Sequence, residues 1–200
     1  MAEIKWSALI IGVLGFLVAY FFDWASLRKV PGAKKLIWLL FLTLEGLALF
    51  LATWQGARFW LPTGLVVVGW VLLPFSIILF IYSLFIEIPF RKTYLDIGVG
   101  QRLIKSGTYA LVRHPGVIWY SLFLLSLVLV TRSITLLVAA PVWVVMDVIY
   151  VVVQDRFFFD RMFTDYGRYR QDVPMLVPTV KSLRNCLRTL VRRRQYNGQY

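Results

Sequence analysis

Five long apolar runs, separated by polar segments, make up most of this chain. Each run is close to the roughly 20 residues that an α-helix needs to cross a bilayer. Hydrophobic residues form 60% of the 200 positions and charged residues only 16%, and a soluble domain could not bury so much apolar surface. We therefore predict an all-α, polytopic membrane protein with about five transmembrane helices. The runs are residues 6–22, 36–54, 64–86, 115–130 and 134–153.

The last two runs are separated only by Thr131-Arg132-Ser133. So short a connection predicts a tight helical hairpin. In the first run, Gly12 and Gly15 lack side chains that would hold a neighbouring helix away, which favours close helix packing.

Lysine and arginine are divided unevenly among the polar segments. The segments after the first, third and fifth runs contain four, five and ten of them, whereas those after the second and fourth runs contain one each. Basic loops remain in the cytoplasm, so we expect the N-terminus outside and the C-terminus, with a helical segment, in the cytoplasm. The net charge of +12 then indicates contact with anionic membrane lipids rather than with nucleic acid.

Cysteine and histidine each occur once, as Cys186 and His114. This excludes an internal disulfide framework and a multi-cysteine metal site, and we expect no site metal. Three regions follow from the pattern. Residues 1–86 form N-terminal transmembrane helices, residues 87–178 contain the motifs and the hairpin, and residues 179–200 form a basic cytoplasmic tail.

The first motif occupies residues 106–115 and ends in Arg113-His114-Pro115. Gly107 permits a turn, and Pro115 suits the first turn of a helix. Arg113 and His114 then lie at a helix N-terminus, where backbone N–H groups and the helix dipole favour an anion. The alternative is that both are ordinary anchors at the membrane surface.

The second motif begins with Gln154-Asp155 and continues through Tyr166 and Tyr169 to a Val-Pro pair at 173–174 and Pro178. Its acids and arginines also fit a surface helix with ion pairs one turn apart. Because the hairpin arms are similar in length, we expect residues 113–115 and 154–169 to form one pocket.

Together the motifs resemble the Gly-x-Tyr…Arg-His-Pro signature of membrane methyltransferases, namely the isoprenylcysteine carboxyl methyltransferases and the related phospholipid N-methyltransferases. The resemblance covers residues 95–178. It implies S-adenosylmethionine as cofactor and a lipophilic or lipid-attached methyl acceptor. It further implies a catalytic role for Arg113 and cofactor binding by a set of polar residues. These are Tyr109, His114, Gln154, Asp155, Tyr166 and Tyr169.

The chain departs from the family pattern at two places. Gln154-Asp155 replaces a Glu-Glu pair, and Val117 stands where an aromatic residue is usual. A non-catalytic lipid- or partner-binding protein with the same fold is therefore an alternative, as is a membrane reductase of the sterol type. Glu45 and Asp147 lie inside apolar runs, where ionisable residues often serve function. The sequence leaves open O- or N-methylation and the oligomeric state.

Overall fold

A computed structural model describes residues 4–30, 32–54, 57–88, 93 and 103–197, with side chains up to residue 190. This part of the chain folds into helices and contains no strand, so the all-α prediction is confirmed. Pro31 and residues 89–102 other than Thr93 lie outside the described residues. The long helices are α1 (Trp6–Arg28), α2 (Ala33–Trp54), α3 (Thr63–Ile81), α5 (Pro115–Thr131) and α6 (Ile134–Val153).

Among the described residues, four helices are long and apolar enough to cross a membrane. These are α1, α2, and α3 and α6 with their helical extensions, Thr63–Glu87 and Ile134–Met162. The apolar helix α5 is shorter, at 17 residues. Its length of about 25 Å at 1.5 Å per residue is slightly below the roughly 30 Å of a hydrocarbon core. In the described part of the chain, four to five helices are therefore able to span a membrane, as in a multi-pass membrane protein.

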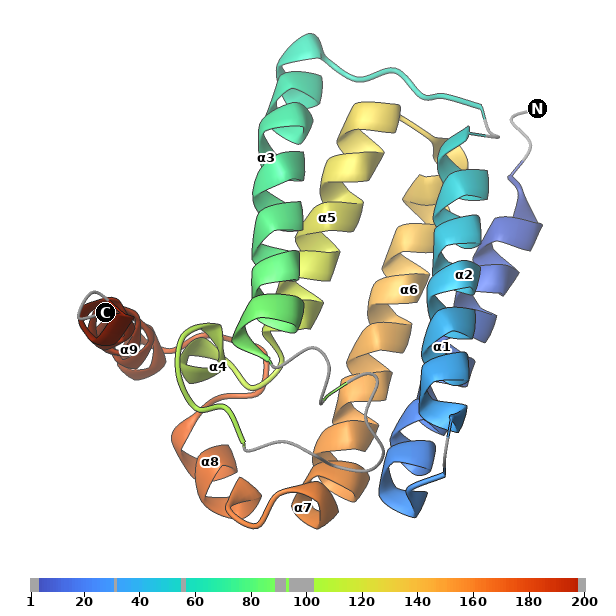
Figure 1. Cartoon of the computed structure of the whole chain (residues 1–200). Coiled ribbons are helices and arrows are strands. Elements are labelled where there is room, and N and C mark those ends of the chain that lie inside the picture. The colour runs from blue at the N-terminus through green and yellow to red at the C-terminus, as the bar shows by residue number, and fades with distance from the viewer. Residues whose placement is uncertain (1–3, 31, 55–56, 89–92, 94–102, 198–200) are drawn as a thin grey trace.

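The long helices run alternately in opposite directions, so that successive connections lie at opposite ends of the bundle (Figure 1). Helix α1 packs against α2 and α6, while α5 packs against α3 and α6. The start of α1 lies at one end, and the short helices α4 (Thr108–Leu111), α7 (Phe159–Met162) and α8 (Tyr166–Asp172) lie at the other. We call the end with α4, α7 and α8 the motif end.

The connection between α5 and α6 is fixed by local hydrogen bonds. Arg132 adopts a left-handed conformation with φ of 55° and ends α5. Ser133 then caps α6, because its Oγ accepts a hydrogen bond from the Leu136 N–H at 3.3 Å. The same hydroxyl donates to the carbonyl of Ala52 at 2.5 Å, which ties this turn to the end of α2.

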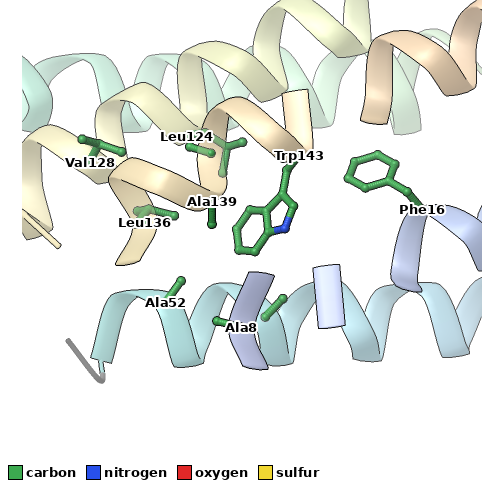
Figure 2. Close-up of a cluster of buried hydrophobic side chains, with 10 residues drawn as sticks. Ala8, Phe16, Ala52, Leu124, Val128, Leu136, Ala139 and Trp143 are labelled. Atoms are coloured by element: carbon green, nitrogen blue, oxygen red, sulfur yellow. The ribbon is translucent and has the colours of Figure 1, made fainter. Parts of the chain in front are cut away.

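Small side chains let the helices approach closely around Trp143, which is fully buried (Figure 2). A Cβ atom on Gly12 would lie 2.3 Å from Trp143 Nε1, and one on Gly15 would lie 2.3 Å from Glu45 Oε1. The expectation of close packing at both glycines is therefore confirmed. Since lipid already surrounds apolar groups, such van der Waals contact is what holds membrane helices together.

The basic linker after α1 is shorter than the sequence pattern indicated. Arg28 is the last residue of α1, and Lys34 and Lys35 belong to the first turn of α2. Lys29 and Gly32 have φ values of 54° and 72°, which reverse the chain at the motif end. The Lys34 side chain is buried, and its ammonium lies 5.4 Å from the centre of the Phe22 ring.

The C-terminal helix α9 (Val180–Asn197) packs against α4. Figure 1 shows it end-on beside α4, across the direction of the bundle helices. Ser182 and Cys186 are buried. Val180, Leu183 and Leu187 are exposed, by 76%, 50% and 57%, so α9 has an uncovered apolar surface.

Candidate functional site

The turn that begins the first motif is built around Glu87. This residue ends a π-helical extension of α3, η1 (Tyr82–Glu87), and is buried. Its carboxylate accepts hydrogen bonds from the Thr108 N–H at 3.1 Å and from the Thr108 hydroxyl. Gly107 has φ of 64°, and a Cβ there would lie 1.6 Å from Glu87 Oε1. The turn predicted at Gly107 is thus present, and only glycine fits beside the carboxylate.

The two motifs are joined through their backbones. Pro115 occupies the first turn of α5, as expected. The N–H groups of Arg113 and His114 donate to the carbonyls of Pro174 and Met175, at 2.9 and 3.2 Å. The anion site expected at this helix end loses those two donors, because the second motif already uses them.

Arg113 and Asp155 form a buried, bidentate ion pair between the motifs. Arg113 Nε donates to Asp155 Oδ1 at 2.9 Å, and Nη2 donates to Oδ2 at 3.0 Å. Nη1 donates to the carbonyls of Arg170 and Val173, at 3.0 and 2.6 Å. The side chains of the pair are only 8% and 6% exposed. The segments 113–115 and 154–169 therefore meet, as predicted, but these two charges bind each other.

Asp155 also accepts hydrogen bonds from Tyr166 Oη and from His114 Nε2, the latter at 3.4 Å. Burial lowers the pKa of His114, and the nearby Asp155 carboxylate offsets only part of this effect. The imidazole is therefore neutral. Since a carboxylate only accepts, the proton lies on Nε2 and Nδ1 is an acceptor. The Phe159 ring stacks on His114, with ring centres 5.6 Å apart.

The two tyrosines of the second motif are neutral donors. Burial, reinforced by the hydrogen bond to Asp155, raises the pKa of Tyr166 well above its ordinary value. Burial likewise raises the pKa of Tyr169. Tyr169 Oη donates to the carbonyl of Tyr109 at 2.6 Å, so it holds α8 against α4.

A cavity of about 700 Å³ extends from this network into the helix bundle. Its wall is mainly apolar and is formed by side chains of α1, α2, α3, α5 and α6, together with residues of both motifs. Six of the seven predicted site residues line it. These are Tyr109, Arg113, His114, Gln154, Tyr166 and Tyr169.

Gln154 faces a partner that the sequence analysis did not identify. Its Nε2 donates to Asp23 Oδ2 and to Tyr150 Oη, both at 2.9 Å. An ionised glutamate at 154, as in the family pattern, would face the Asp23 carboxylate with no hydrogen to donate to it. Glutamine at 154 is therefore compatible with the acid at 23, because its amide can donate a hydrogen bond to that carboxyl group. Val117, the other departure, is buried and lines the cavity.

Asp23 and Glu87 are buried acids near the site that the motifs did not predict, although the same sequence feature marks both. Each is an acid placed directly after an apolar run, at 6–22 and 64–86. Both are 3% exposed. A charged residue at such a position becomes buried when the helix extends past the apolar run.

The surface acids of the second motif pair differently from the expected spacing of one helical turn. Arg170 pairs with Asp160 at 3.4 Å, and Lys105 pairs with Asp165 at 3.7 Å. Within the described part of the chain, no group of three or more His, Cys, Asp or Glu side chains is arranged to bind a metal ion.

Comparisons of the chain with models of protein families, with curated proteins and with solved structures gave no match.

Proposed function

We propose that the protein transfers a methyl group from S-adenosylmethionine to a lipophilic or lipid-attached acceptor at the membrane. The observation that carries the proposal is the cavity of about 700 Å³, which joins a polar network to an apolar interior. Its volume is in the range of small-molecule sites, about 300–1,000 Å³. A polar cofactor and an apolar acceptor could meet in such a space.

The lining residues at the motif end suit the cofactor. Tyr109, His114 and Gln154 offer polar atoms, and the rings of Phe159 and Phe163 also line the cavity. Aromatic faces suit an adenine ring and a sulfonium. For the amino-acid part of the cofactor, Asp23 and Lys34 provide opposite charges on the cavity wall at this end.

Arg113, to which the family resemblance assigns a catalytic role, is proposed as a positioning residue. Its guanidinium already donates to Asp155 and to two backbone carbonyls. It therefore fixes the second motif over the cavity, with Tyr166 and Tyr169. The bound cofactor would supply an electrophilic methyl group. The protein would align the acceptor and exclude water, which are the main contributions available without acid–base chemistry.

The proposal includes five membrane crossings, with α5 and α6 as a helical hairpin and the motif end in the cytoplasm. Among the described basic residues at that end, Arg28 ends α1 and Lys35 lies in the first turn of α2. The described basic residues at the other end are Lys5 before α1, Arg132 after α5, and Arg58, which donates to the carbonyl of Thr131. This division follows the positive-inside rule. Reporter fusions at residues 58, 132 and 200 test it, and a cytoplasmic signal at 132 would exclude the arrangement.

Calorimetric titration of the purified protein with S-adenosylmethionine, or with its demethylated product, tests the cofactor assignment. We expect binding, weakened about three- to tenfold by Gln154→Ala, since one hydrogen bond contributes about 0.5–1.5 kcal/mol. Asp160→Asn, at the exposed ion pair with Arg170, is the control and should bind as the wild type does. A wild-type protein that binds neither compound would reject the proposal.

One observation favours the second candidate, a non-catalytic lipid-binding protein with the same fold. Arg113 and Asp155 satisfy each other, so they need no polar ligand. This candidate predicts that lipophilic molecules bind whereas the cofactor does not. The same titrations, repeated with a lipophilic probe, separate the two functions.

A further inference from the structure

A second polar cluster lies deeper in the cavity, away from the motif end. It consists of Glu45 from the middle of α2, Tyr120 from α5 and Asp147 from α6, all of which line the cavity. Asp147 precedes Asp155 by eight residues, which is about 12 Å along a helix. The cluster is therefore separate from the ion pair that joins the motifs.

The acidic side chains on the cavity wall differ in whether a cation is paired with them. At the motif end, Arg113 is paired with Asp155, and Lys34 attracts Asp23. Glu45 and Asp147 are close enough to interact electrostatically with each other. Neither forms an ion pair with a Lys, Arg or His side chain in the described part of the chain. Two neighbouring carboxyl groups in an apolar wall favour a cation between them.

The hydrogen bonding of Glu45 is also incomplete. The residue is 8% exposed, and its Oε2 accepts one long hydrogen bond, from Tyr120 Oη at 3.4 Å. Its Oε1 is buried and has no hydrogen-bond partner among the described residues. Buried polar atoms are nearly always satisfied in folded proteins. A donor from a bound molecule would complete this group.

Aromatic rings surround the same position. The ring centre of Phe16 lies 6.0 Å from that of Tyr120 and 6.3 Å from that of Phe41. The ring centres of Phe80 and Tyr120 are 6.2 Å apart. All four residues line the cavity. Ring faces attract ammonium groups, including methylated ones. Carboxyl groups and aromatic rings in one pocket thus match a cationic nitrogen and would repel a carboxylate.

From this geometry we infer that Glu45, Asp147 and Tyr120 bind the amino group of a lipophilic amine, whose apolar part occupies the rest of the cavity. The inference rests on the proposed function in one respect, since it makes the methyl acceptor an amine rather than a carboxylate. In that reaction the ammonium first gives a proton to the Glu45 carboxylate. The nitrogen lone pair then forms the N–CH₃ bond, and the electron pair of the broken S–CH₃ bond stays on sulfur.

Binding of octylamine to the full-length protein in phosphatidylcholine nanodiscs tests the inference, with empty nanodiscs as the blank. Octanol and octanoate serve as neutral and anionic probes of equal chain length. We expect octylamine to bind at least tenfold more tightly than either. Glu45→Gln should weaken octylamine binding by about ten- to a hundredfold, as for loss of one charge-assisted hydrogen bond. Asp160→Asn should leave binding unchanged.

Equal binding of octanol or octanoate would overturn the inference, as would full octylamine affinity in Glu45→Gln. Asp147→Asn carries the same expectation and replaces Glu45→Gln if that variant does not fold. Titration with S-adenosylhomocysteine separates this inference from the proposed function. Octylamine binding that depends on Glu45, without binding of S-adenosylhomocysteine, would reject the methyltransferase and keep the amine site. If Glu45→Gln instead lost S-adenosylhomocysteine and kept octylamine, the cluster would belong to the cofactor and the inference would fail.

Discussion

Replacing Arg113 by leucine should destabilise the protein more than any change at an exposed charge. The variant leaves Asp155 buried with no cation beside it, and it removes the donor to the carbonyls of Arg170 and Val173. Breaking a buried pair by removing one partner costs about 3–5 kcal/mol. The pair is 8% and 6% exposed, so solvent screening reduces this cost little. We therefore expect the free energy of unfolding to fall by about 3–5 kcal/mol.

Equilibrium unfolding in mixed micelles of rising dodecyl sulfate content, followed by circular dichroism, measures this change. Asp160→Asn is the matched control, because its ion pair with Arg170 is 48% and 42% exposed and such pairs contribute below about 1 kcal/mol. The double variant Arg113→Leu with Asp155→Leu should lose less than the sum of the two single variants, by about 2 kcal/mol. If Arg113→Leu cost no more than the control, or if the two changes were additive, the ion pair would not be what joins the motifs.

Three further outcomes are expected. Gly107→Ala should lower the free energy of unfolding by about 1–3 kcal/mol or more, because alanine is strained at the φ of 64° found there. Gly167→Ala is the control and should not lower it, since nothing lies within 4 Å of its added Cβ. Equal effects of the two variants would contradict the packing described at Gly107. The fold lowers the pKa of His114 and holds it neutral, so on acidification the unfolded chain binds a proton at this residue before the folded protein does. The contribution of His114 to the free energy of unfolding is therefore lost as pH falls through about 6.5. The difference between wild-type and His114→Gln unfolding curves at pH 8 and pH 5 measures that contribution, and parallel curves would refute it. Leu183→Glu with Leu187→Glu should speed hydrogen exchange of α9 in nanodiscs that contain anionic lipid, because exposed apolar side chains beside cations favour the membrane surface; unchanged exchange would show that α9 does not touch lipid.

Much of the fold could be predicted from the sequence because a bilayer requires long apolar segments whose backbone is satisfied within each helix. The apolar runs accordingly fall within α1, α2, α5 and α6, and within α3 together with its extension η1. Their ends could not be predicted equally well. Helix α1 continues to Arg28 and α2 begins at Ala33, since hydropathy detects the part of a helix in lipid and not the turns beyond it.

At the candidate site, the spacing of the two motifs was sufficient to predict that Arg113 lies near Asp155. The spacing did not show that the two groups would satisfy each other's hydrogen bonds. Asp155 lies in a π-helical segment, η3 (Gln154–Phe158), at the end of α6, and the apolar pattern does not indicate that local geometry. The contact between Glu45 and Tyr120 could not be predicted from the sequence either. Residues 75 positions apart meet only through the rotation of α2 and α5 about their axes, and the first of these helices has no motif that fixes it.

The burial of Cys186 gives the protein a built-in reporter of α9. This thiol is 6% exposed, and burial raises its pKa, so little of it is in the reactive thiolate form. Alkylation by a maleimide must then await separation of α9 from α4. Because the chain has one cysteine, the labelling rate of the unmodified protein measures how often the C-terminal helix separates from α4.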